Sequence, residues 1–164
     1  MVVGFWDPAT GKKLPLIPQE ESSWAWGVFS PDGRYIVSVS FGDSFLRKPM
    51  VLWDTATGKR LRSFEGDGFP SSFTPDGRWL IGSSGIGPVA IWDVATGKQL
   101  VQLLTLDCGT EWLAVTPDGH FDGSPEGCRA LAFRIGDGLD VVPIERFKDQ
   151  YHRPGLLKEI FRDK

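Results

Sequence analysis

The sequence predicts an all-β fold built from repeated four-stranded antiparallel units. Two short motifs each occur three times along the 164 residues, and the two motifs alternate strictly. Residues that form turns are abundant, with 20 Gly and 12 Pro, and so are aromatic residues, with 7 Trp and 11 Phe. Frequent turns between short aromatic-rich stretches are typical of strands joined as hairpins.

The spacing of the two motifs predicts the size of the repeat. The first is Trp-Asp-x-Ala-Thr-Gly-Lys, whose Trp residues lie 47 and 39 residues apart, at Trp6, Trp53 and Trp92. The second is Ser/Thr-Pro-Asp-Gly, whose Pro residues lie 44 and 42 residues apart, at Pro31, Pro75 and Pro117. A period of about 40–45 residues is that of the four-stranded blades of β-propellers. The repeats therefore predict a partial β-propeller.

Each full repeat predicts four strands in a fixed order. The first strand precedes Pro-Asp-Gly, the second follows it, the third ends at Trp-Asp, and the fourth leaves the second turn. We expect first strands at 26–29, 69–73 and 112–115, second strands at 34–41 and 78–83, third strands at 50–53 and 88–92, and fourth strands at 60–64 and 98–104. Gly58 and Gly97 are expected to have φ > 0, because each follows Asp-x-Ala-Thr in a hairpin turn.

The two ends of the chain depart from the full repeat. Residues 1–17 are expected to supply two strands of a split blade, and residues 111–142 a last, degenerate blade that is broken at 123–128. After Pro143 the apolar period becomes helical, with stripes at Ile144, Phe147 and Tyr151, then at Leu156, Leu157, Ile160 and Phe161. We therefore expect a partial propeller over 1–142 and a short helical C-terminal extension over 143–164. The total is about three and a half blades, fewer than the roughly four to eight that close a propeller.

Composition excludes several classes of protein. With 18 Lys and Arg against 21 Asp and Glu, the net charge of −3 gives no sequence-wide case for binding nucleic acid or an anionic membrane. No apolar run approaches the ~18 residues of a membrane span, and the N-terminus lacks a signal-peptide pattern. The two cysteines do not make a disulfide scaffold, so a reducing cytoplasm is the expected compartment.

The residues able to do catalytic or metal chemistry are few. Cys108, His120, Cys128 and His152 are the only thiol and imidazole groups, and no Cys-x-x-Cys occurs, so we expect neither a metal site nor a cofactor. A nucleophile pair of Cys128 with His120 would make the chain an unrecognised hydrolase. The other interpretation is a turn histidine and a small packed cysteine, which we favour because no third orienting group accompanies the pair.

A Gly-rich acidic loop near the C-terminal repeat resembles a calcium loop in its spacing. Oxygen-bearing side chains alternate through it, at Asp118, Asp122, Ser124 and Glu126. An EF-hand loop needs Asp or Asn where His120 stands. Acidic turns between strands are the alternative interpretation, and we favour it.

Candidate partner-binding residues come mainly from one loop. The segment 42–49 is longer than its counterpart at 84–87 and carries Phe45, Arg47 and Lys48. Aromatic and basic residues on a rim loop suit contact with a protein partner, although an irregular insertion with a packed Phe is equally compatible. We add Trp26 and Phe69 to these candidates.

The repeat resembles that of WD-repeat β-propellers. Trp53-Asp54 and Trp92-Asp93 stand where that family ends its third strand. The family's Gly-His pair before the first strand is replaced by Glu65-Gly66-Asp67, and 84–87 lacks the turn Asp. The resemblance therefore implies that the family's polar relay is absent. Trp53 and Trp92 should act by packing, and their indole N–H groups need other partners.

The C-terminal segment is similar to a narrower group. The stretches 111–125, 142–143 with Phe147, and 151–157, about residues 110–161 in all, resemble the closing segment of certain bacterial WD-repeat proteins. Some of those proteins carry a caspase-like protease or another effector domain beside the propeller. The resemblance implies a non-catalytic scaffold or sensor for protein–protein interaction, in a bacterial assembly. The alternative is an accessory or regulatory part of a protease system. The expected partner is an unidentified protein, a second copy, or a missing half of the propeller.

Overall fold

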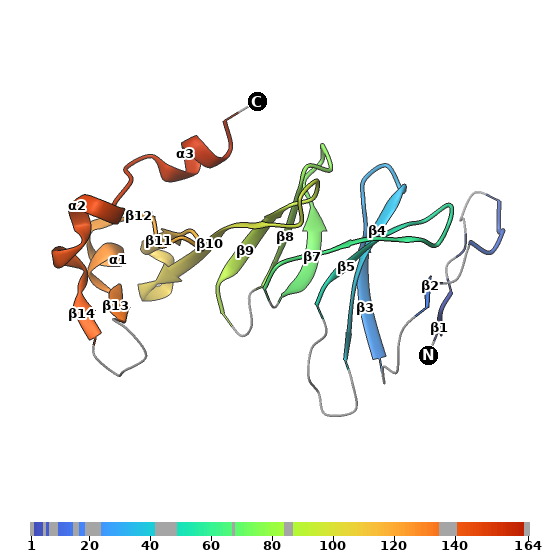
Figure 1. Cartoon of the computed structure of the whole chain (residues 1–164), viewed down its shortest axis with the longest axis horizontal. Coiled ribbons are helices and arrows are strands. Elements are labelled where there is room, and N and C mark those ends of the chain that lie inside the picture. Colours follow the sequence, from blue (N-terminus) through green and yellow to red (C-terminus); the bar gives the residue numbers. More distant parts are fainter. Residues whose placement is uncertain are drawn as a thin grey trace. The chain divides into compact units, whose positions relative to one another are not determined.

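The computed structural model describes residues 2–4, 6, 10–14, 17–18, 24–41, 49–66, 68–83, 87–134 and 141–162. The chain forms two compact units, Met1–Gln99 and Leu100–Lys164. The described elements of the first unit are all strands, whereas the second unit combines strands with short helices (Figure 1). The prediction of an all-β fold is confirmed.

The first full repeat forms a four-stranded antiparallel sheet. Its strands are β3 (Trp24–Phe29), β4 (Tyr35–Phe41), β5 (Val51–Asp54) and β6 (Arg60–Ser63). Each strand pairs with the next in the sequence, so β3 and β6 lie at the two ends of the sheet (Figure 1). This is the meander that the order of the two turns predicts.

The second repeat follows the same order. Strands β7 (Phe69–Phe73), β8 (Trp79–Ser83) and β9 (Val89–Asp93) pair antiparallel in the first unit. Its fourth strand, β10 (Gln99–Leu106), begins at the last residue of that unit. Near the N-terminus, β1 (Val2–Val3) pairs antiparallel with β2 (Ile17–Pro18), which agrees with the expected two-stranded piece.

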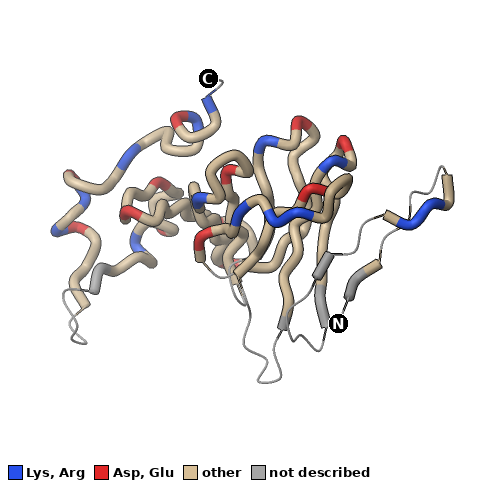
Figure 2. The backbone as a smooth tube through the Cα atoms, turned by 45° about the vertical axis from the view of Figure 1, so that its right-hand side comes forward, with Lys and Arg blue, Asp and Glu red and all other residues tan. Residues whose placement is uncertain are grey.

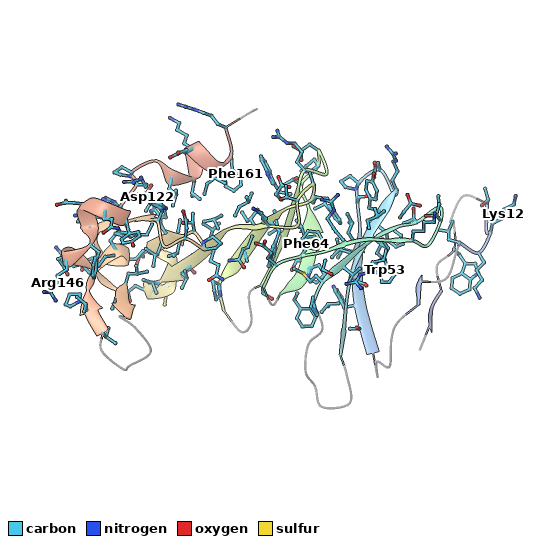
Figure 3. The ribbon with its side chains drawn as sticks, in the orientation of Figure 1. Lys12, Trp53, Phe64, Asp122, Arg146 and Phe161 are labelled. Carbon is cyan, nitrogen blue, oxygen red and sulfur yellow. The ribbon has the colours of Figure 1, made fainter. Side chains whose placement is uncertain are left out.

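The core of the first unit is shared by the two repeats. Its buried side chains come from both sheets and from the segments that join their strands: Val37, Val39, Met50, Leu52, Phe64, Leu80, Ala90, Trp92 and Val94. Val37 and Val39 alternate along β4, which places both on the same face of the sheet. Trp53 belongs to a smaller cluster with Ile36 (Figure 3). The sheets therefore bury apolar side chains on one another as propeller blades do.

The two turn motifs adopt the expected conformations. Gly58 has a φ of 68° and Gly97 a φ of 77°, which confirms the left-handed turn. The two turns of each blade are also joined, because Thr55 N donates to Arg34 O at 3.0 Å and Val94 N donates to Arg78 O at 2.9 Å. Charged residues of the first unit gather in and beside these turns (Figure 2).

The motif tryptophans of the two full repeats, Trp53 and Trp92, are buried and use partners other than a His or an Asp side chain, whereas Trp6 is 59% exposed. Trp92 is fully buried, and its Nε1 donates to the backbone oxygen of Glu65 at 2.9 Å. Trp53 Nε1 donates to Ser38 Oγ at 2.9 Å. Both residues therefore act by packing, with one indole hydrogen bond each, as the missing relay residues imply.

The third repeat differs from the expected four-stranded blade. In the second unit, β11 (Glu111–Val115) pairs with β10 and also with β12 (Phe121–Gly123). The connection η1 (Asp107–Gly109) reverses the chain tightly, since all three of its residues have positive φ. Helix α1 (Pro125–Arg129), capped by Ser124, then lies where the sequence predicts a break in the blade, at 123–128. Strands β13 (Ala132–Arg134) and β14 (Val141–Pro143) form a separate pair.

The C-terminal segment is helical, as its apolar stripes predict. It contains η2 (Ile144–Arg146), α2 (Lys148–Tyr151) and α3 (Leu156–Ile160). Ile144 packs in a cluster with Leu113 and Phe121, and Leu156 is also buried. The domain division at 142/143 stays a prediction, and the compact units divide at 99/100. Within the described ranges, no helix has the length and apolar character needed to cross a bilayer.

Candidate interaction surfaces

The residues predicted to contact a partner fall into three groups. Phe45, Arg47 and Lys48 lie outside the described residues. Trp26 lies on β3 with 52% of its surface exposed, while its Nε1 donates to Pro70 O at 3.1 Å. Phe69 is half-buried and packs against the core of the first unit, so part of its surface serves the fold.

Strand β3 carries a second exposed aromatic residue that the sequence analysis did not select. Phe29 has 44% of its surface exposed, beside the 52% of Trp26. Residues three apart on a strand project to opposite faces, so the two rings lie on either side of β3. Since β4 is the one strand paired with β3 among the described residues, the other edge of β3 has no hydrogen-bonded strand there, although β7 lies beside β3. We call Trp26, Phe29 and this edge the β3 edge.

A groove lies between the two blades of the first unit. Its volume is about 510 Å³. One wall comes from the first blade and the other from the two turns of the second blade: Tyr35, Leu52, Leu61, Arg62, Asp76, Gly77, Arg78, Asp93, Val94 and Ala95. We call it the interblade groove. The groove could not be predicted from the sequence, because no motif marks where two blades separate at their turns.

The charged groups of the interblade groove differ in how they are satisfied. Asp76 Oδ1 accepts from Thr74 Oγ1 at 2.5 Å and from Arg78 N at 3.1 Å. The Thr74 hydrogen bond, followed by that of the Arg78 amide, lowers the pKa of Asp76 below 3.8. Asp93 Oδ1 accepts from the backbone and hydroxyl of Thr96. By contrast, Arg62 Nε is buried and has no hydrogen-bond partner in the described part of the chain.

His120 and Cys128, the alternative nucleophile pair, line two different hollows in the described part of the second unit. His120 Nδ1 lies 2.8 Å from Asp118 Oδ2, and His120 lines a hollow with Thr116 and Arg153. Cys128 lines a different hollow, with Phe121 and His152. Burial, and then the charge of Asp122, raises the pKa of the Cys128 thiol above its usual 9.0. A thiol that resists ionisation is a poor nucleophile, so this arrangement does not support catalysis.

The oxygens of the suspected calcium loop are engaged separately. Asp118 accepts from Thr116, and Asp122 Oδ2 accepts from Gly155 N at 2.8 Å and Leu156 N at 3.3 Å (Figure 3). Ser124 caps α1, and Glu126 pairs with Arg129 on that helix. Among the described residues, no three His, Cys, Asp or Glu side chains gather in a way that could hold a metal ion. These acids therefore have roles in turns and helix ends.

The repeated blades and their turns define a protein of the β-propeller class. The chain is 39% identical over 56 residues to an uncharacterized WD repeat-containing protein of Deinococcus radiodurans, a match that covers 32% of this chain and 20% of that protein. The matched stretch thus spans about a fifth of that relative's length, and it supports a WD-repeat relationship over this stretch. Among solved structures, the computationally designed Ika4 protein is similar with a TM-score of 0.46 at 21% identity, over 75% of this chain and 78% of that one. No protein-family model matches the chain.

Proposed function

We propose that this chain is a non-catalytic protein-interaction module that acts as part of a larger propeller assembly. The observation that carries the proposal is the β3 edge, where Trp26 and Phe29 are 52% and 44% exposed on a strand at the end of its sheet. Aromatic side chains are enriched at protein interfaces, where they bury a large apolar area at low entropic cost.

The chemistry of the β3 edge indicates how a partner would bind. A strand edge offers backbone N–H and C=O groups to another extended segment, and side chains on both faces add specificity. A second copy could supply its own β3 edge by two-fold symmetry, and a missing half of the propeller could supply a blade strand. Either occupant would bury apolar surface that is otherwise exposed to solvent.

The setting that we propose is a bacterial, cytoplasmic assembly. The resemblance of 110–161 to closing segments of bacterial WD-repeat proteins supports a place beside a caspase-like or other effector domain, for which this module would be a sensor or scaffold. The raised pKa of Cys128 supports a role without catalysis by this chain. Nucleic acid and membrane are not among the partners that we propose, because the net charge is close to neutral.

Self-association is the first form of the proposal to test. Size-exclusion chromatography with light scattering would compare the wild type, the double variant Trp26→Ser/Phe29→Ser, and the control Val89→Ser. Val89 is 43% exposed, on β9, so the control removes apolar surface of similar exposure elsewhere. We expect the wild type and the control to exceed the 18.1 kDa monomer increasingly at micromolar concentrations, and the double variant to remain monomeric. A strictly monomeric wild type, or equal loss in the control, would overturn association through the β3 edge.

A further inference from the structure

We infer that the C-terminal segment 151–156 is a strap that closes the outer edge of β12 and prevents a further strand from adding to the sheet there. The strap takes the place on β12 that the third strand takes in each full repeat. This inference concerns the second unit and does not require the β3 edge to associate, so it goes beyond the proposed function.

The outer edge of β12 is the edge at which a third strand would pair. Thr116 N donates to His120 O at 2.9 Å, which places the backbone of His120 on the side of β11. Backbone groups alternate in direction along a strand, so those of the next residue, Phe121, point away from β11. Among the described residues, β12 is the last strand of its sheet. The outward backbone groups of β12 therefore need a partner that is not a further strand of this sheet.

The strap supplies that partner at Phe121. Arg153 N donates to Phe121 O at 2.9 Å, and His152 pairs with Phe121 as a parallel bridge. The rings of His152 and Phe121 stack, with centroids 5.1 Å apart and an interplanar angle of 24°. The strap therefore covers both the outward backbone and the ring of Phe121.

The same pairing occurs in the two full repeats, where the motif tryptophan has the place of His152. In each repeat a second-strand residue that is at most 1% exposed lies opposite a residue with an aromatic ring. The three pairs are Ile36 with Trp53, Leu80 with Trp92, and Phe121 with His152. The third strands β5 and β9 run antiparallel to their neighbours, whereas the strap runs parallel to β12. A segment of the opposite direction thus fills the position of a third strand.

Asp122 anchors the far end of the strap. Its Oδ2 accepts from Gly155 N at 2.8 Å and from Leu156 N at 3.3 Å. Leu156 is itself buried, and His152 Nε2 lies 3.8 Å from Asp122 Oδ1. Backbone, carboxylate and apolar contacts therefore hold the strap across β12.

The strand that the strap keeps away is a third strand of another copy. An uncovered strand edge accepts extended segments, and natural proteins cover such edges with loops or helices. The chain carries three Trp-Asp segments, so strands of the kind that an open β12 edge would accept are present in every copy. Closing this edge ends the array of strands at β12.

The test uses a blocked peptide of residues 87–97, which contains β9 and its turn, as a third-strand probe. Its matched control has Pro in place of Trp, which removes both the ring and a backbone N–H. Both peptides are titrated against the full chain and against the variant Asp122→Ala/Leu156→Ser, and the amide resonances of Phe121 and Gly123 are followed by NMR. We expect the variant to bind the probe at least about tenfold more tightly than the wild type, because the strap leaves the edge open in less than about a tenth of the molecules. Equal affinity of the two proteins, no binding by the variant, or equal affinity of probe and control would overturn the inference.

Further variants separate release of the strap from loss of the fold. The control Asp118→Ala/Lys158→Ser changes an acid of the neighbouring turn and an exposed residue of α3, and it should bind the probe as weakly as the wild type. Tight binding by this control would contradict the role of the strap. The single variants Asp122→Ala and Leu156→Ser should each give intermediate affinity, and they replace the double variant if its near-UV circular dichroism is lost. Wild-type affinity in both folded single variants would also overturn the inference.

A competition experiment identifies the edge that binds the probe. A peptide of residues 150–162, which contains the strap, should displace the probe from the double variant. Simultaneous binding of the two peptides would contradict a shared edge. The same spectra report the amides of Trp24–Phe29, so binding at the β3 edge is observed separately from binding at Phe121. A failure of the proposed function at β3 therefore leaves the result for the strap intact.

Discussion

At the scale of single residues, the three Pro-Asp-Gly turns share one arrangement. In each, a hydroxyl donates to the Asp two positions later, from Ser30, Thr74 or Thr116. The Asp in the first two turns also accepts the amide of the Arg two positions further on. All these contacts lie within a few residues of one another, so the motif alone was enough to predict the turns.

Gly97 should be harder to replace than Gly33, although both are turn glycines with positive φ. A Cβ there would lie 2.6 Å from the Ser63 carbonyl oxygen, in addition to the strain of a φ of 77°. Gly33 has a similar φ of 68° with no heavy atom within 4 Å of its Cβ position. We expect Gly33→Ala to cost about 1 kcal/mol and Gly97→Ala at least about 1 kcal/mol more. Denaturant unfolding of both variants measures the difference, and equal losses would show that the Ser63 contact relaxes freely.

The turn carboxylates should make stability depend on pH in the acid range. The Thr74 hydrogen bond lowers the pKa of Asp76 in the folded state below 3.8. Because its pKa is lower in the folded state, ionised Asp76 stabilises the fold fully at a pH above its unfolded-state pKa. This stabilisation is lost as the pH falls through the folded-state pKa. The gap in unfolding free energy between wild type and Asp76→Ala should therefore be constant from neutral pH to about 4 and narrow below it. A gap that stays constant to about pH 2, or widens on acidification, would contradict this pKa shift.

At the scale of elements, polar contacts of side chains join segments that lie far apart in the sequence. Trp92 on β9 reaches the backbone of Glu65, between β6 and β7. Asp122 on β12 accepts two amides at the start of α3. The partners of both side chains depend on packing, so sequence spacing alone could not identify them.

Trp92→Phe should lose the indole hydrogen bond and a small part of the buried area. Because the ring is fully buried and its Nε1 donates to the backbone oxygen of Glu65, we expect a loss of about 1–2 kcal/mol in unfolding free energy. Trp112→Phe, at a residue that is 39% exposed, should change stability little. Thermal or denaturant unfolding followed by circular dichroism gives both values. A far larger loss in Trp92→Phe would indicate a polar network beyond Glu65.

Asp122 should hold α3 against β12. In Asp122→Ala, Gly155 N and Leu156 N lose their acceptor, so amide hydrogen exchange across 155–160 should become faster. Asp118→Ala is the matched control, since Asp118 interacts with Thr116 and His120 in its own turn. Unchanged exchange in α3 of Asp122→Ala would show that Leu156 packing alone fixes the helix.

In the third repeat, sequence patterns predict only part of the observed structure. Its Thr116–Gly119 turn forms as predicted, with Gly119 at a φ of 88°. The pairing of β10 with β11 depends on the left-handed conformations of Asp107 and Cys108, which residues other than Gly rarely adopt. The start of α1 carried a readable signal, because Ser124 followed by Pro125 is a typical helix N-terminus.

At the scale of the molecule, the candidate sites were less predictable than the fold. Trp26 could be selected because no repeat position assigned it to the core. Phe29 could not be selected from the sequence, because its exposure depends on which strand ends the sheet. The unpaired Nε of Arg62 could not be predicted either, because it depends on how the two blades meet. Propeller blades are specified by short-range turns, whereas their binding surfaces arise from long-range packing.

The central claim, that the β3 edge binds a protein segment, is tested most directly by residue-resolved hydrogen exchange as a function of concentration. About half of the β3 amides point away from β4, and these have no strand partner in the described part of the monomer. We predict that exchange of these amides within Trp24–Phe29 slows as the concentration of the wild type rises, while exchange in β9 does not change. Concentration-independent exchange in β3, or protection that grows in β9 instead, would contradict the claim.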